Sequence, residues 1–239
     1  MHLIHHLILL DEDSPLRKGI EVIDSKLSVD TVSDLDYYLI SCAKAYCSLT
    51  SSVDKAKLSI SLLSYENITK FDTDSQSISD FIELFIENTI IRIQSIYDRT
   101  LIFVNRLLEL GISNECINHS TLVTNDNVKK YGLDKKLKSL NKACSEYRNI
   151  RNTIIHHDRY SEENLDMLSM VHQVEFASKQ EGKKTLIPES QLNEITELFM
   201  TDSQGELGEY LEEIESKLHE IYNSACVIYA KKKLAYQKI

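Results

Sequence analysis

The sequence predicts an all-α protein, and three observations carry this expectation. Only two prolines and six glycines interrupt 239 residues, which is too few for the many turns of a β protein. Apolar residues recur at steps of three and four between residues 77 and 110, and a second such pattern follows residue 134. Hydrophobic residues make up 42% and charged residues 27% of the chain, an ordinary mixture for a folded domain.

The first 75 residues predict two to four short helices. Their apolar groups, around residues 35–46 and 58–63, are separated by clusters of Ser, Asp and Thr that can cap helix starts. The apolar first ten residues contain three histidines and no basic stretch, and they run into Asp11, so we expect no signal peptide. No run approaches about 18 consecutive apolar residues, which predicts no membrane span and a cytoplasmic protein.

The segment from Ser77 to Leu110 predicts one long amphipathic helix, with Gly111 as its C-terminal stop. A polar line runs along the same helix. We expect this line to face solvent, because amphipathic helices have such a face, although a groove is the alternative. The line consists of Asn88, Arg92, Ser95, Arg99 and Arg106.

The remaining elements follow from caps and periodicity. Asp134 is the expected N-cap of a helix that continues through Ile154. Residues 162–175 predict another helix, and residues 180–184, ahead of Pro188, predict a surface loop. Residues 190–238 are helical in pattern again, with an expected break or bend around residues 202–205.

The cysteines predict neither disulfides nor a zinc site. There are five, an odd number, and none is spaced as CxxC, so we expect reduced and mostly buried thiols. They are Cys42, Cys47, Cys116, Cys144 and Cys226.

Charge is distributed unevenly along the chain. The formal net charge is −10, yet residues 129–159 contain nine basic and three acidic residues, a local charge of +6. An acidic protein does not adhere broadly to nucleic acid, whereas a local basic strip can steer a polyanion to one place. The alternative is a solvated helix face, which is the more frequent explanation of a charge run.

One motif in this strip combines an arginine, a polar residue and a histidine. In Arg151-Asn152-Thr153-Ile154-Ile155-His156 the histidine stands five residues after the arginine. This pattern resembles the HEPN superfamily, whose active-site signature is an arginine four to six residues before a histidine, with Asn, Asp or His directly after the arginine. The resemblance implies an all-α, HEPN-like helical bundle and a metal-independent endoribonuclease that acts as a homodimer. It also implies a biological role as a toxin or phage-defence effector, with a separate antitoxin or regulator chain.

The residue types suit RNA cleavage by attack of a ribose 2′-hydroxyl on the adjacent phosphate. Histidine can transfer a proton near neutral pH, and arginine holds two phosphate oxygens with a permanent charge. We therefore expect catalytic roles for Arg151, Asn152 and His156. Arg148, Lys142 and His157 are the expected RNA-binding residues. The scheme requires neither a metal nor a cofactor.

Helix geometry adds a condition. Five residues advance a helix by about 140°, so Arg151 and His156 do not share one narrow stripe, whereas residues 148, 152 and 156 roughly align. Two facing copies of the motif in a homodimer would solve this problem. Structural alternatives remain open: the arginines can pair with carboxylates, and His156 can favour the helix dipole. A metal at His157 and Asp158 is the least favoured.

The expected organisation has three parts. Residues 76–178 form the HEPN-like core, flanked by an N-terminal helical extension (1–75) and a C-terminal helical segment (179–239). We expect the three parts to pack together as one globular unit. Two other functions stay open. One is a non-catalytic HEPN-like module that binds RNA, a nucleotide or a protein, and the other is a helical scaffold.

Overall fold

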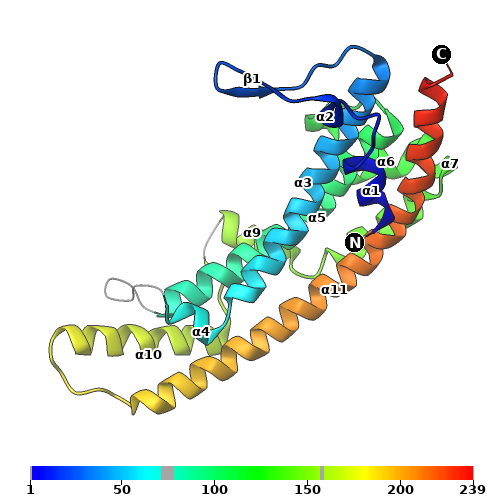
Figure 1. Ribbon diagram of the computed structural model, residues 1–239. Coiled ribbons are helices and arrows are strands. Elements are labelled where there is room, and N and C mark those ends of the chain that lie inside the picture. The colour runs from blue at the N-terminus through cyan, green and yellow to red at the C-terminus, as the bar shows by residue number, and fades with distance from the viewer. Residues whose placement is uncertain (1, 71–77, 157–158, 239) are drawn as a thin grey trace. The chain divides into compact units, whose positions relative to one another are not determined.

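The described residues fold as an all-α chain, as the sequence predicts, with one short hairpin among them. The computed structural model describes residues 2–70, 78–156 and 159–238 (Figure 1). The elements in chain order are α1 (Leu3–Leu9), α2 (Pro15–Lys18), β1 (Glu21–Ile23), β2 (Lys26–Ser28), α3 (Asp34–Leu62), α4 (Tyr65–Ile68), α5 (Ile78–Leu108), the 3-10 turn η1 (Asn114–Cys116), α6 (His119–Thr124), α7 (Asp126–Lys130), α8 (Leu133–Ala143), α9 (Arg148–His156), α10 (Glu163–Gln180) and α11 (Glu189–Tyr236).

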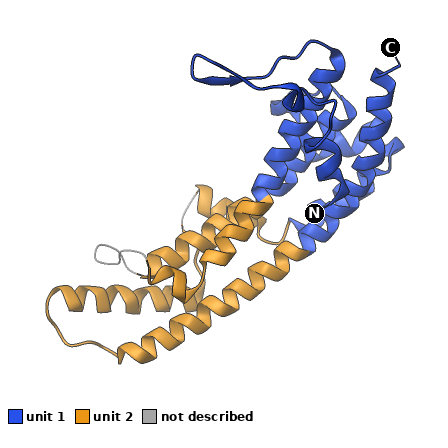
Figure 2. Cartoon of the chain, viewed as in Figure 1, with its two compact units in different colours: residues 1–52, 95–144, 213–239 blue, residues 53–94, 145–212 orange. Residues whose placement is uncertain are grey.

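These elements form two compact units (Figure 2). Unit 1 comprises residues 1–52, 95–144 and 213–239, and unit 2 comprises residues 53–94 and 145–212. The long helices α3, α5 and α11 contribute residues to both.

Unit 1 has a core rich in tyrosine and aliphatic side chains. Tyr46 and Phe103 lie with ring centroids 5.7 Å apart, and both contact the ring of Tyr222 on α11. The N-terminal segment is tied to α11 by a polar cluster. Lys233 Nζ lies 2.6 Å from the buried carboxylate of Asp11, which also accepts a hydrogen bond from the Tyr229 hydroxyl at 2.9 Å.

Unit 2 has an aliphatic core built from α3–α5, α10 and α11. Its buried members are Leu63, Ile68, Ile82, Ile86, Ile90, Leu165, Leu168, Leu192, Met200 and Leu207. A buried polar pair joins α10 to α11, where His172 Nε2 lies 2.9 Å from Thr196 Oγ1.

The N-terminal region differs from the expectation of short helices. Residues 35–46 and 58–63 do not lie on separate helices, because α3 runs without a break from Asp34 to Leu62. The intervening hydroxyl residues are accommodated because they bond back to the helix: Thr50 Oγ1 donates to the carbonyl of Tyr46 at 3.2 Å. The β1–β2 hairpin was not predicted, and its three-residue strands give no periodic signal.

The predicted helix 77–110 is confirmed as α5, which ends at Leu108. The left-handed turn begins at Glu109 (φ 54°) and includes Gly111 (φ 70°), so the stop precedes the glycine. The polar line does not face solvent. Its members are half-buried or paired with α3: Ser95 donates to Ser52 in unit 1, and Asn88 donates to Ser59 at 3.2 Å in unit 2. The polar line is covered because serines of the facing helix α3 pair with it. The periodicity of α5 could not predict this pairing, because it contains no information about α3.

The helix predicted from Asp134 through Ile154 is two helices. Gly132, in a left-handed conformation (φ 66°), precedes α8 instead of an Asp134 cap, and residues 144–147 separate α8 from α9. The break has a packing reason. Leu140 and Cys144 are buried in unit 1, whereas Ile150 is partly buried and packs against the core of unit 2.

The C-terminal region is more continuous than predicted. Residues 163–180 form α10, close to the expected 162–175, and the expected loop follows it. No break occurs around residues 202–205, because α11 is helical from Glu189 to Tyr236. Buried Met200 and Leu207 hold this stretch on both sides, and Gln204 Nε2 donates to the carbonyl of Ile60 at 2.9 Å.

Two further findings concern cysteines and membranes. All five cysteines are free thiols, but only Cys42 and Cys144 are buried, so the expectation of mostly buried thiols is wrong. Among the described residues, none of the helices combines the length and the apolar character that a membrane crossing requires.

Candidate active site on helix α9

Helix α9 carries the arginine, asparagine and histidine of the motif. The helix starts after a turn in which the Arg148 amide donates to the Ser145 carbonyl at 3.2 Å. Its inner face is apolar, with Ile150 and Ile154 packed against the core of unit 2. The spacing of four residues between these isoleucines fixes which face of the helix turns outward.

The outward face presents the polar residues of the motif. Arg148, Asn152 and His156 are exposed at intervals of four residues, on the side away from Ile150 and Ile154. None of the residues of α9 is fully buried. These three side chains are therefore accessible at the surface of the described chain.

Arg151 lies at the flank of that face and is half-buried. Its Nη1 donates a hydrogen bond to Oδ1 of Asn152 at 3.1 Å, so these two motif residues are in contact. His156 stands at the C-terminal end of α9, about 140° around the helix from Arg151. The motif therefore brings Arg151 and Asn152 together, while His156 occupies a neighbouring part of the surface.

An aromatic side chain anchors the start of the helix. The ring of Tyr147 lies with its centroid 4.9 Å from that of Tyr210 on α11, within unit 2. Burial raises the pKa of the Tyr147 hydroxyl, helped by the charges of Glu206 and Glu146. Tyr147 is consequently a neutral packing residue, and it holds the N-terminal end of α9 in place.

The segment after α9 is fastened by ionic contacts. Arg159 donates to Glu83 on α5 at 3.2 Å and to Asp166 on α10 at 3.0 Å. The next amide, that of Tyr160, donates to Glu87 at 2.7 Å. Arg159 belongs to the basic strip, but in this structure it is a structural residue. Pattern alone could not distinguish it from the other arginines, since its partners come from two distant helices.

Two of the expected RNA-binding residues, His157 and Lys142, are not placed beside Arg148 by the structure. His157, with Asp158, lies outside the described residues. Lys142 is exposed on α8 and belongs to unit 1, whereas Arg148 belongs to unit 2. Within the described parts of the chain, no group of three or more His, Cys, Asp or Glu residues is arranged to hold a metal ion.

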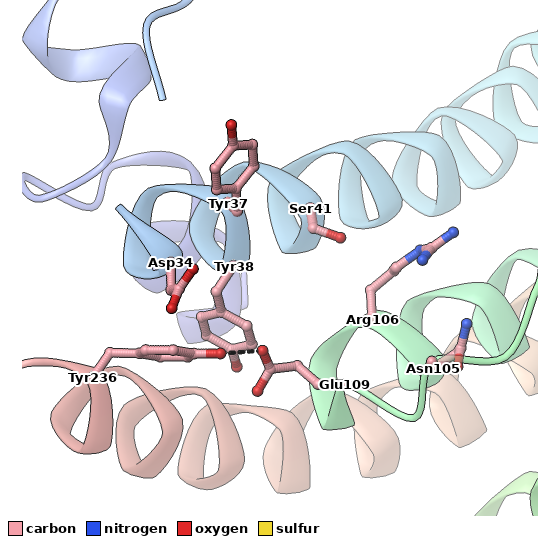
Figure 3. A pocket seen from close by; sticks show the side chains of 9 residues that line it. Asp34, Tyr37, Tyr38, Ser41, Asn105, Arg106, Glu109 and Tyr236 are labelled. Atoms are coloured by element: carbon pink, nitrogen blue, oxygen red, sulfur yellow. Dashed lines mark hydrogen bonds between the residues drawn. The ribbon is translucent and has the colours of Figure 1, made fainter. Parts of the chain in front are cut away.

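A separate pocket of about 470 Å³ lies in unit 1 and contains none of the motif residues. Among the side chains that line it, Glu109 accepts a hydrogen bond from the Tyr236 hydroxyl (Figure 3). Lys232 Nζ, outside the lining, also donates to Glu109, at 2.7 Å. The hydrogen bond to Glu109 and burial raise the pKa of Tyr236 to about 12. Sequence analysis missed this pocket, because its lining comes from three segments far apart in the chain. The lining residues are Asp34, Tyr37, Tyr38, Ser41, Asn105, Arg106, Glu109, Gly111 and Tyr236.

Comparison with known proteins identifies one family. The model of the Cthe2314-like HEPN family matches residues 38–238. The match thus includes α9, and it extends beyond residues 76–178, where the sequence predicts the HEPN-like core. The chain has no significant match among curated proteins or among solved structures.

Proposed function

Because the chain belongs to the Cthe2314-like HEPN family, we propose that it is a metal-independent endoribonuclease whose active site is the outward face of α9. The observation that carries this proposal is the Arg151–Asn152 contact on a helix that also presents an exposed His156. An arginine held by its neighbour can receive a phosphate, and the histidine of a facing copy can transfer a proton.

The proposed reaction is an internal transfer. The 2′-hydroxyl oxygen of the ribose attacks the adjacent phosphorus and loses its proton to the imidazole of His156. The bond from phosphorus to the 5′ oxygen breaks, and that oxygen takes up the proton from the imidazolium of His156. Arg151 stabilises the charge on the phosphoryl oxygens. The products are a 2′,3′-cyclic phosphate and a 5′-hydroxyl.

A homodimer is part of the proposal, because Arg151 and His156 of one copy lie about 140° apart around α9, whereas the His156 of a facing copy can meet the phosphate that Arg151 holds. The surface of α9 is compatible with a partner chain. Ile155, four residues after Arg151, is 44% exposed, and such an apolar side chain gains from being covered. In this arrangement Asn152 positions Arg151, and Arg148 is an auxiliary phosphate contact.

The proposed biological role is that of a toxin or phage-defence effector that cleaves RNA in the cytoplasm. Such an activity requires control by a separate antitoxin or regulator chain. The resemblance of the motif to HEPN ribonucleases supports this role.

The test compares purified wild type with His156→Ala and Arg151→Ala on total RNA in the presence of a chelator. Thr153→Ala is the matched control, since Thr153 is exposed on α9 and its hydroxyl bonds only to the carbonyl of Asn149 among the contacts described. We expect wild type and the control to cleave RNA, leaving 2′,3′-cyclic phosphate ends, and both motif variants to be inactive. Cleavage that survives either motif substitution, or that stops only when metal is removed, contradicts the proposal. Inactive wild type that still binds RNA would favour a non-catalytic HEPN module.

A further inference from the structure

Helix α8 has two opposite faces of different character. Leu133, Leu137 and Leu140 are buried in unit 1. The opposite side carries Lys135, Lys138 and Lys142, all exposed, which we call the lysine face. At 100° per residue the three lysines fall within an arc of about 60°, and they span about 10 Å along the helix axis.

Two other lysines of the basic strip, Lys136 and Lys129, have partners within the chain. Lys136 reaches α11, where Nζ donates to the carbonyl of Glu220 at 2.9 Å and to Ser224 at 2.6 Å. Lys129 Nζ lies 3.7 Å from Asp126 within α7. Lys135 and Lys138 have no ion pair with a carboxylate in the described part of the chain. Lys135 and Lys138 thereby differ from Lys136 and Lys129, whose ammonium groups have partners within the chain.

We propose that the lysine face of α8 binds the phosphates of single-stranded RNA, as a second contact surface in addition to α9. Lysine suits this role because its ammonium is a compact point charge that meets a phosphate oxygen without a fixed geometry. Contacts of this kind position a nucleic acid and carry no sequence preference. The choice of RNA as the polyanion rests on the proposed function.

The composition of α8 favours RNA over an acidic protein as the occupant. Protein interfaces have an apolar centre and are depleted in lysine. Beside the lysines, the partly exposed positions of α8 include Asp134, Ser139 and Asn141, and the one apolar side chain among them is the small Ala143. The rest of the chain is acidic, with a net charge of −10 overall, so a concentrated basic face guides RNA to one region.

The experiment measures the salt dependence of RNA binding in a His156→Ala background, which prevents cleavage under the proposed mechanism. The probe is a fluorescent, unstructured RNA oligonucleotide of 20 nucleotides, and the readout is anisotropy between about 0.05 and 0.3 M salt, where counterion release controls affinity. The test variant is Lys135→Gln/Lys138→Gln. The matched control is Lys44→Gln/Lys55→Gln, which removes the same charge from exposed positions of α3. Thermal melting of each variant establishes that it is folded.

The logarithm of the affinity decreases with the logarithm of the salt concentration, and we expect the magnitude of this slope to be smaller by about 1.4 in the test variant. Each lost phosphate contact accounts for about 0.7 of this change. At about 0.1 M salt this corresponds to a roughly 25-fold weaker affinity. Adding Lys142→Gln lowers the slope by about 0.7 more. The control variant keeps the parent slope.

Three results would overturn the proposal. In the first, the test variant keeps the salt slope of its parent, and in the second, the control variant loses as much slope as the test variant. In the third, the test variant no longer binds polyglutamate, used as a second probe, while its affinity for RNA is unchanged. The last result would identify an acidic polypeptide as the occupant. Failure of the proposed function is read separately, by cleavage. Cleavage of RNA by the His156→Ala variant would contradict the α9 mechanism. In that case the salt slopes are measured with 2′-deoxy oligonucleotides, which cannot be cleaved in this way, and they still test the lysine face.

Discussion

The Arg151 guanidinium donates a hydrogen bond from Nη1 to Oδ1 of the adjacent Asn152, over 3.1 Å. This contact uses one of the five N–H donors of the guanidinium, so the planar fork keeps donors for a phosphate. It also explains why an amide follows the arginine in the motif: Asn152 limits the directions in which Arg151 can point. Asn152 is in this sense a positioning residue.

Lysine should fail to replace Arg151, because an ammonium cannot hold two phosphate oxygens in a fixed plane. We expect Arg151→Lys to lower kcat for RNA cleavage at least about tenfold, the scale of one charged hydrogen bond. Arg148→Lys is the matched comparison, since Arg148 is exposed one turn earlier and needs only its charge. Equal losses in both variants, measured by single-turnover cleavage, would rule out a special role for the guanidinium of Arg151.

The fold class and the motif could be predicted from sequence because both depend on local spacing. The recurrence of apolar residues at steps of three and four in α5, and the order of Arg151, Asn152 and His156, follow directly from the amino-acid sequence. The break between α8 and α9 could not be predicted, because it depends on which core buries Cys144 and which receives Ile150. The role of Arg159 was hidden for the same reason, since Glu83 and Asp166 are remote in sequence.

The start of α3 should be sensitive to loss of Asp36. Its carboxylate accepts from the Ser33 amide at 3.0 Å, and its own amide donates to Ser33 Oγ at 3.1 Å, a reciprocal cap. We expect Asp36→Ala to lower the free energy of unfolding by about 1 kcal/mol, a typical loss for a cap. Thermal or urea denaturation measures this change.

Acid should remove the advantage of Asp36. Hydrogen bonds from Ser33 lower the pKa of Asp36 from 3.8 to about 2 in the folded chain, against the effect of burial. A lowered carboxyl pKa stabilises the fold above the unfolded value, and this contribution is lost as pH falls through the folded value. The difference between wild type and Asp36→Ala should therefore be full above about pH 4 and shrink toward about pH 2. A difference that is constant across this range would show that the carboxylate charge is irrelevant.

Unit 2 should weaken below neutral pH because of His172. Burial lowers the pKa of His172 from 6.5, and its ring is bonded to Thr196. The unfolded chain then binds the proton more readily than the folded chain, so stability is full above about pH 6.5 and falls as the pH drops toward the folded pKa. His172→Gln keeps a hydrogen-bonding side chain and should flatten this part of the urea-midpoint profile. His219→Gln, at an exposed position in unit 1, is the control that should keep the slope.

The composite site predicts complementation between two inactive chains. If each active site joins Arg151 of one copy to His156 of the other, a mixed dimer of Arg151→Ala and His156→Ala contains one site with both residues and one site with neither. Random pairing makes half of the dimers mixed, so the mixture should recover up to about a quarter of wild-type activity, by the statistics of a twofold dimer. Each variant alone should stay inactive under the same conditions. If Arg151 and His156 act from the same chain, every site in the mixture lacks one of them. The two variants are therefore unfolded and refolded together so that mixed dimers form. Absence of recovered activity would then exclude the composite arrangement.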